Sequence, residues 1–292
     1  MNKPKKEVMK KEKKKVAFAS VVAAVFLTGF KLVVGLLTGS LGILSEALHS
    51  GLDLVAAAIT YFSVSVSDKP ADREHHFGHG KIENFSALIE TFLLLITCGW
   101  IIYEATNRLV TGETHIEVTV WSYIVVVSSI LIDISRSRAL YKVARKHNSQ
   151  ALEADALHFS TDIWSSAVVL LGLICAQFGL FFADSVAALM VAGIVLLVSF
   201  RLGKRAMDVL LDKAPAQTFS KIETALQQIE EITHFHDIRI RTSGADTFVE
   251  VNIHVKPSLS IQEAHEISHR AEKEICRIVE RCVVHVHTEP DE

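Results

Sequence analysis

The sequence predicts a membrane domain of six transmembrane helices followed by a small soluble α+β domain. Half of the 292 residues are apolar and the mean hydropathy is +0.32, which is high for a soluble chain of this length. Charged residues are concentrated at the N-terminus, in the stretches 68–81 and 136–146, and after residue 200. The apolar runs between them have about 20 residues each, enough for a helix to cross a bilayer.

The connections between the apolar runs alternate in charge. The predicted spans are 16–37, 43–66, 83–109, 117–140, 155–178 and 184–203. Lysine or arginine occurs before the first span, in the second and fourth connections and after the sixth span, whereas the other three connections contain none. Because positive charge is retained in the cytosol, this pattern predicts six spans with both termini cytosolic.

The first fifteen residues contain eight lysines and form a predicted cytosolic segment, 1–15, whose lysines we expect to be solvated. A full-length apolar span follows directly, without the small-residue cleavage site of a signal peptide. We therefore assign 16–208 to the transmembrane domain and 209–292 to a cytosolic regulatory and dimerisation domain. The four cysteines form no CxxC pair, which argues against a disulfide framework or a thiolate zinc knuckle.

The composition after Leu211 becomes that of a soluble domain. Helices are predicted over 218–231 and 261–280, and strands over 236–243, 246–256 and 282–288. The order αββαβ is that of a ferredoxin-like, metallochaperone-like fold. A domain of about 80 residues buries only a small core on its own, which favours dimerisation.

Two of the predicted spans contain the same polar pattern. His49 and Asp53 in the second span, and His158 and Asp162 in the fifth, are each spaced i,i+4 and therefore share a helix face. An ionisable residue at the bilayer centre costs about 2.5–3.5 kcal/mol on insertion scales. Two imidazoles and two carboxylates form a tetrahedral ligand set for Zn²⁺. The alternative is that these groups pack between helices or line a water-filled cavity.

Two other charged residues within the predicted spans lack this pattern. Asp133 is expected near the cytosolic end of the fourth span, and Lys31 either snorkels to the interface or lines a pore. Neither is assigned a ligand role.

The connection after the second span is a second candidate metal site. Asp72, His75, His76 and His79 lie within eight residues, and glycines on both sides of His79 allow the backbone to fold around an ion. A polar loop that binds no metal is the equal alternative.

The predicted soluble domain is rich in histidine. It contains His234, His236, His254, His265, His269, His285 and His287. Strand alternation places Phe248, Glu250, Asn252 and His254 on one face of the second strand, and His285, His287 and Glu289 on one face of the last. A metal cluster is favoured over a merely exposed polar face.

Residues 265–269 read HEISH and match the HExxH motif of zinc proteases. The motif falls in the amphipathic helix of a small domain, where there is little room for a substrate cleft. A chance match is therefore favoured, and the protease interpretation makes Glu266 essential.

Three segments resemble the cation diffusion facilitator family. They are SLGILSEALHSGLD, FGHGKIE and ALEADALHFSTD, at 40–53, 77–83 and 151–162. They occur in order, each in its expected span or loop, and the resemblance covers the chain from about residue 15 to its end.

The resemblance implies a homodimeric exporter of zinc and related ions that exchanges metal for protons by alternating access. It implies three sites: a transport site of His49, Asp53, His158 and Asp162; a loop site of Asp72, His75 and His79, with His76 outside the pattern; and a cytosolic site drawing on His236, His265, His287 and Glu289. Asn252 stands where the family often has histidine, with His254 as the substitute ligand, and Glu289 stands where aspartate is common. Lys81 and Asp212 are implied to pair and hold the dimer together.

The predicted function is therefore Zn²⁺/H⁺ antiport, with no enzymatic activity. A set of two histidines and two aspartates favours Zn²⁺ over the harder Mn²⁺. Export of iron, manganese, cobalt, nickel or cadmium stays open, as does a metal-gated channel. Zn²⁺ is expected as substrate and as a regulatory ligand; the expected partners are a second copy of the chain, lipid and protons, with no nucleic acid. The compact chain without a targeting signal favours a bacterial inner (plasma) membrane.

Overall fold

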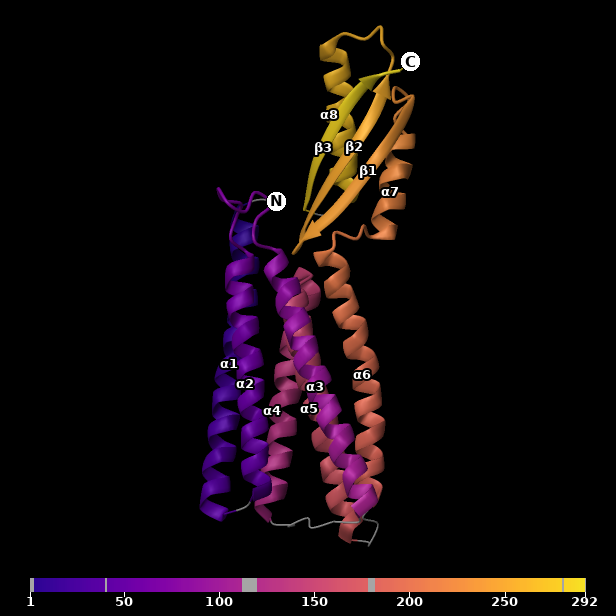
Figure 1. The fold of residues 1–292 in the computed structure, drawn as a ribbon. Coiled ribbons are helices and arrows are strands. Elements are labelled where there is room, and N and C mark those ends of the chain that lie inside the picture. Colours follow the sequence, from indigo (N-terminus) through magenta and orange to yellow (C-terminus); the bar gives the residue numbers. More distant parts are fainter. Residues whose placement is uncertain (1–2, 40, 112–119, 178–181, 280, 292) are drawn as a thin grey trace. The chain divides into compact units, whose positions relative to one another are not determined.

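The computed structural model describes the chain except for residues 1–2, 40, 112–119, 178–181, 280 and 292 (Figure 1). The chain divides into two compact units. One comprises the helices of residues 2–68 and 82–206, and the other comprises residues 69–81 together with 207–292. Each unit is described by itself below.

Six long helices form the first unit and extend a few residues beyond it. They are α1 (Lys3–Thr38), α2 (Leu41–Ser67), α3 (Lys81–Thr111), α4 (Val120–His147), α5 (Gln150–Gln177) and α6 (Phe182–Leu210). Among the described residues, α1, α2, α3 and α6 are long and apolar enough to cross a membrane. The predicted third and fifth connections, 110–117 and 179–183, lie mostly outside the described residues.

The lysine-rich start of the chain is part of α1 rather than a separate segment. Most of its described lysines are exposed, as predicted, but Lys13 is only 3% exposed. The prediction of a fully solvated lysine run is therefore wrong at Lys13. Partners from other helices surround its ammonium group, and a sequence pattern does not reveal such contacts.

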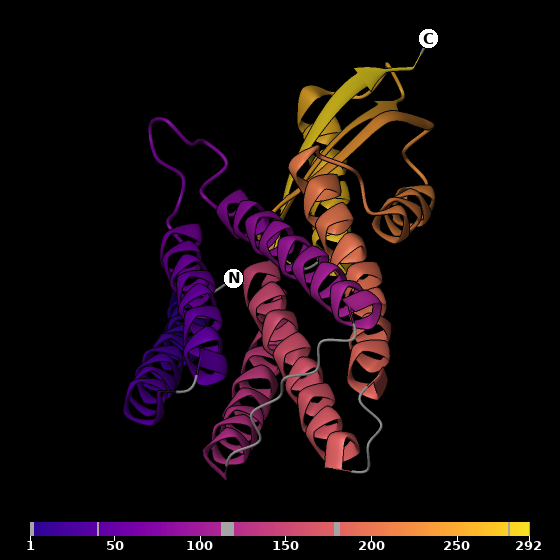
Figure 2. The ribbon, with the colours of Figure 1, turned by 60° about the horizontal axis from the view of Figure 1, so that its bottom comes forward.

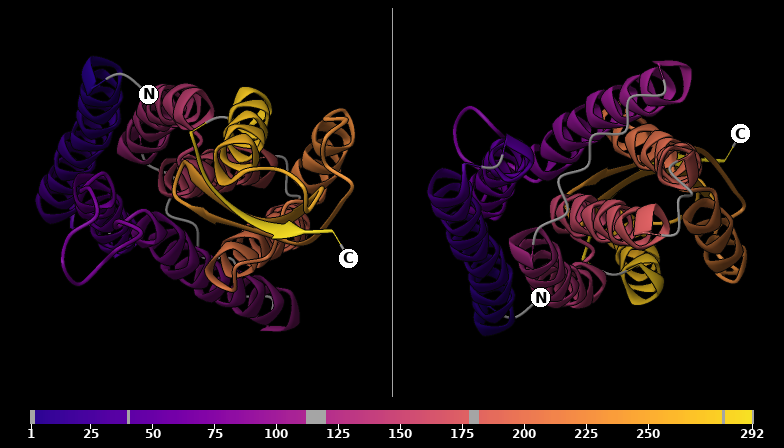
Figure 3. Two further views of the ribbon diagram at one scale, coloured as in Figure 1. Left: turned by 90° about the horizontal axis from the view of Figure 1, so that it is seen from above. Right: turned by 90° about the horizontal axis from the view of Figure 1, so that it is seen from below.

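Two helix pairs build the centre of the bundle. The helix α1 runs beside α2, and α4 runs beside α5; the pairs meet through α1 with α4 and α2 with α5 (Figures 2 and 3). Small residues allow this close packing, and one apolar cluster joins all four helices. It consists of Ala17, Ala24, Ala57, Val64, Leu140, Ala144, Ala151, Leu152, Ala156 and Phe159. We call this cluster the four-helix core.

The soluble domain has the predicted order αββαβ. Its elements are α7 (Ala216–Gln227), β1 (His234–Ser243), β2 (Asp246–Val255), α8 (Ile261–Ile278) and β3 (Cys282–Pro290). The sheet order is β1-β2-β3, with β1 antiparallel and β3 parallel to β2. The buried valines and isoleucines of β2 pack against Ile267, Ala271 and Ile275 of α8, so the helices cover one face of the sheet (Figure 3).

The other face of the sheet carries the polar side chains. In the strand register, His236 lies opposite Asn252, and His254 lies opposite Glu289. A bulge between His236 and Arg239 shifts the alternation by one residue, with Asp237 at φ +53°. The bulge lets Ile240 point into the core, 5% exposed, while the histidines before it stay on the open face.

The N-terminus of α8 is held by a capping box in which Ser260 and Glu263 bond each other's backbone N–H groups. The bond from the hydroxyl of Ser260, followed by that from its backbone N–H, holds the pKa of Glu263 below its ordinary value. We predict that Ser260→Ala lowers the local stability of this turn by about 1 kcal/mol, or about fivefold in amide exchange rate. Hydrogen exchange on the full-length protein in detergent measures this, with Ser258→Ala as the matched control. Equal protection in both variants contradicts the assignment.

Candidate metal centre

The four intramembrane residues predicted as ligands lie together in the first unit. Asp53 on α2 and His158 on α5 are in contact, with 2.9 Å between Oδ1 and Nε2. His49 Nε2 lies 3.6 Å from Asp162 Oδ1 and 3.9 Å from Asp53 Oδ1. Nε2 of His158 lies 3.9 Å from Oδ2 of Asp162. One ligand atom from each of His49, Asp53 and Asp162 lies within 4.8 Å of the others, and His158 adjoins this group through Asp53.

The separations of these atoms are close to those between neighbouring ligands of a metal ion. With metal–ligand bonds of about 2.0–2.1 Å, neighbouring ligand atoms of a tetrahedron are about 3.3 Å apart. The four separations above scatter around that value. Asp53, His158 and Asp162 have side-chain exposures of 11%, 4% and 12%, whereas His49 is 36% exposed. His49 is thus the ligand most open to its surroundings.

Charged residues near these ligands have partners of their own. Lys31 is 4% exposed, and its ammonium donates to Ser50 Oγ at 2.8 Å and to Glu46 Oε2 at 3.1 Å. It therefore does not snorkel. Asp133 is likewise buried and accepts a hydrogen bond from Arg136 at 3.3 Å. Both Lys31 and Asp133 therefore have partners outside the group of four candidate ligands.

Two fully buried acids, Glu90 and Asp155, were not predicted from the sequence. Glu90 on α3 accepts hydrogen bonds from the hydroxyls of Thr60 and Ser86, and Asp155 on α5 accepts one from Ser20. The available signal was an acidic residue within an apolar span, the same signal that singled out the ligand aspartates. Without a repeated HxxxD pattern it gave no reason to group them.

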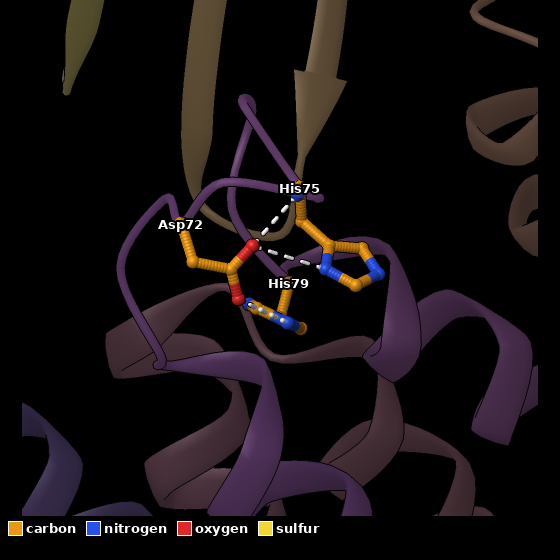
Figure 4. A group of neighbouring side chains, drawn as sticks. All are labelled: Asp72, His75 and His79. Atoms are coloured by element: carbon orange, nitrogen blue, oxygen red, sulfur yellow. Dashed lines mark hydrogen bonds and ion pairs between the residues drawn. The ribbon is translucent and has the colours of Figure 1, made fainter.

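The loop residues form a compact cluster in the second unit (Figure 4). Asp72 Oδ1 lies 3.2 Å from His75 Nδ1, and Asp72 Oδ2 lies 3.4 Å from His79 Nε2. One ligand atom from each residue falls within 4.8 Å of the others. His76 instead bonds the carbonyl of Arg73 at 3.1 Å. The cluster therefore contains the three expected residues and leaves His76 out.

The loop backbone prepares Asp72 for a cation. Backbone N–H groups of His75 and Glu74 donate to Oδ1 at 2.7 and 3.0 Å. These bonds, that of His75 first, hold the pKa of Asp72 below its ordinary value. The carboxylate is therefore charged at neutral pH without the help of a metal.

The loop also packs on the hairpin of β1 and β2 within the same unit. Phe77 meets Phe248 edge to face at 5.2 Å, and the guanidinium of Arg241 lies 3.5 Å from the Phe77 ring centroid. A Cβ at Gly80 would overlap the backbone of Ser243 and Gly244, so only glycine permits this approach. Lys81 and Asp212 form an ion pair at 2.8 Å within one chain.

A third cluster lies on the open face of the sheet. His236 Nε2 is 3.1 Å from His254 Nε2, and both lie 3.4–3.6 Å from Glu289 Oε2. His254 Nδ1 contacts the carbonyl oxygen of Pro290 at 3.2 Å. A proton on Nδ1 would leave Nε2 free as a ligand. Three ligand atoms with an open fourth position fit a Zn²⁺ site.

The other residues expected at the cytosolic site have different places. His265 lies on α8, on the opposite side of the sheet, with its ring stacked on that of His269 at 5.8 Å. It is therefore not part of this cluster within one chain. His287 approaches the other oxygen of Glu289 at 3.5 Å. Asn252 donates to that same oxygen at 3.2 Å and so orients the carboxylate.

Two family profiles match the sequence. The cation efflux transmembrane domain matches residues 17–211, and the cation efflux protein, cytoplasmic domain, matches residues 214–291. The chain belongs to the cation diffusion facilitator family. The predicted family and fold are thereby confirmed, and the chain is a membrane protein of a family of cation efflux transporters.

Full-length relatives agree with this assignment. An uncharacterized transporter of Methanocaldococcus jannaschii is 31% identical over 279 residues, which cover 94% of this chain and 98% of that protein. The cation-efflux pump FieF of Shewanella oneidensis is 29% identical over 276 residues, 93% of this chain and 92% of FieF. The magnetosome protein MamB of Magnetospirillum gryphiswaldense is 29% identical over 266 residues, 90% and 89% of the two chains.

Among solved structures, the C-terminal domain of MamM in a nickel form is similar to part of the chain. It has 24% sequence identity and a TM-score of 0.26, and the match covers 27% of this chain and all of that domain.

The open-face cluster predicts which histidine matters for metal binding to the soluble domain. We expect His254→Ala to weaken Zn²⁺ binding there by at least about 100-fold. Loss of an outer-sphere partner of a ligand costs up to about 100-fold in metal affinity, and loss of a ligand itself should cost no less. Calorimetric titration of the full chain in detergent should show one Zn²⁺ fewer bound at high affinity. His269→Ala, an exposed histidine paired with Glu272 on α8, is the matched control. Unchanged stoichiometry in His254→Ala contradicts a site at this cluster.

Proposed function

We propose that this protein exports divalent transition-metal ions, Zn²⁺ first, in exchange for protons by alternating access. The observation that carries the proposal is the cluster of His49, Asp53 and Asp162, with His158 in contact with Asp53, between α2 and α5. Two carboxylates balance the charge of a divalent ion, which lowers the cost of holding it in a low-dielectric interior. Two imidazoles favour Zn²⁺ over harder ions.

Proton exchange follows from the ligand chemistry. A metal ion needs neutral imidazole and ionised carboxylate, so metal and protons compete for the same atoms. Imidazole has an ordinary pKa of about 6.5 and changes charge within the physiological range. Protons entering from outside would displace the metal from His49 and His158. The protonated carrier would then return to the cytosol-facing state and release them.

The remaining assignments complete the proposal. Both termini lie in the cytosol, the chain works as a homodimer, and the host membrane is a bacterial inner membrane. The loop cluster of Asp72, His75 and His79 and the open-face cluster of His236, His254 and Glu289 bind cytosolic metal. Metal at these clusters would make transport respond to its cytosolic concentration. Lys81 and Asp212 contribute to holding the dimer together.

The transport site is tested by Asp162→Asn, which keeps the side-chain volume and removes the charge. We expect Zn²⁺ uptake into proteoliposomes under an imposed pH gradient to fall to the background level. Glu266→Gln, in the HEISH segment of α8, should transport as the unaltered protein does. Normal uptake by Asp162→Asn contradicts the site. Zn²⁺ flux that does not depend on the pH gradient indicates a channel. Loss of uptake in Glu266→Gln contradicts the proposed transport mechanism.

The metal preference is tested by His49→Asp. Replacing one imidazole with a carboxylate makes the ligand set harder. We expect the preference for Zn²⁺ over Mn²⁺, measured by competition in the same vesicles, to fall by at least about tenfold. The exchange His269→Asp, outside the membrane domain, controls for the added charge. An unchanged preference would show that His49 does not select the metal.

A further inference from the structure

Four helices are joined by a buried ionic network at the end of the bundle where α1 begins. The ammonium of Lys13 on α1 lies 2.9 Å from Asp68 Oδ1, at the end of α2, and 2.7 Å from Glu83 Oε1, on α3. The hydroxyl of Ser67 donates to Glu83 at 2.8 Å, and that of Ser149, directly before α5, donates to the other Glu83 oxygen. Glu83 is thus the common acceptor of three donors.

This network is shielded from solvent. The side chains of Lys13 and Glu83 are 4% and 5% exposed, and that of Asp68 is 11% exposed. Removal of one partner of such a buried ion pair strongly destabilises the packed arrangement around it, because the other charge is left buried and unpaired. Beside it, Glu12 on α1 pairs with Lys146 and His147 at the end of α4. Ion pairs and hydrogen bonds therefore link the starts of α1, α3 and α5 to the ends of α2 and α4.

The four-helix core lies between this network and the metal ligands. Along α2, Ala57 and Val64 of the core follow Asp53 and precede Ser67. Along α5, Ala151, Leu152 and Ala156 precede His158. Apolar packing and an ionic tie therefore both separate the ligands from this end of the bundle. Toward the other end, the side chains of His49 and Glu46 are 36% and 43% exposed.

We propose that Lys13, Asp68, Glu83 and Ser149 form a gate that closes the metal path on the cytosolic side, with Lys13 and Glu83 as its central pair. The proposal rests on the transport function and topology proposed above. The structure then represents a state closed to the cytosol. The Lys13–Glu83 pair must separate before a cytosolic ion can reach Asp53 and His158. The gate residues act on access and do not bind the metal at the transport site.

The gate is tested by the cytosolic accessibility of a cysteine at Ala57, which is fully buried in the four-helix core. The native cysteines Cys98, Cys175, Cys276 and Cys282 are replaced by alanine, and Ala57→Cys is labelled with a membrane-impermeant maleimide in inside-out vesicles. We expect Lys13→Met to raise the labelling rate by at least about tenfold, because it leaves buried carboxylates unpaired. Lys11→Met, an exposed lysine of the same helix, should leave the rate unchanged.

Further variants keep the test decisive if Lys13→Met does not fold. Glu83→Gln retains the shape of the acceptor without its charge and should also accelerate labelling. Lys13→Arg keeps a positive charge between Asp68 and Glu83 and should leave labelling slow. Folding is checked by size-exclusion chromatography and Zn²⁺ binding. Unchanged labelling in folded Lys13→Met and Glu83→Gln overturns the gate.

The outcome also separates the gate from the function on which it rests. If the parent protein carries Zn²⁺ and the gate variants label like it, the gate is wrong and the transporter stands. If the parent protein moves no metal at all, the proposed function fails, whatever the labelling rates. If the gate is right, Lys13→Met labels faster and transports more slowly, because the state closed to the cytosol is destabilised.

Discussion

The mutual pairing of His49, Asp53, His158 and Asp162 is the interaction on which the helical unit depends. Each of these groups alone is costly in a low-dielectric interior. Together they place opposite charges or hydrogen-bonding partners 2.9–3.9 Å apart. This arrangement requires α2 and α5 to lie face to face at the correct height, and small residues such as Ala57 and Ala156 permit the close approach.

Polar networks on either side of this site connect it to the ends of the bundle. Lys31 ties α1 to α2 next to His49, and Arg136 links Asp133 to Ser20. Nearer the start of α1, Lys13 and Glu83 join the helices again. Such networks have discrete bonded and broken arrangements, which suits the alternating access proposed for this protein. Apolar packing alone has no such pair of bonded and broken arrangements.

The second unit combines two candidate ligand clusters on one rigid support. The loop of Asp72 is held against the β1–β2 hairpin through Phe77 and Arg241, and the sheet carries His236 and His254 at its other end. Loops position ligands well only when a scaffold fixes them. Here the aromatic contact and the close approach of Gly80 provide that support, so the positions of the candidate ligands depend on the conformation of the hairpin.

Hydropathy and helix periodicity are local properties, so the six long helices, the αββαβ order and the two HxxxD pairs could be predicted from the sequence alone. The sequence also predicted which face of β2 is polar. It did not determine that Lys13 is buried, that Glu90 and Asp155 lie inside the bundle, or that His254 rather than His265 joins His236. Those facts depend on how distant segments meet: Asp68 at the end of α2 and Glu83 on α3 pair with Lys13, and the sheet separates α8 from the open face. Only tertiary packing decides such contacts, since no local pattern records which residue lies across an interface.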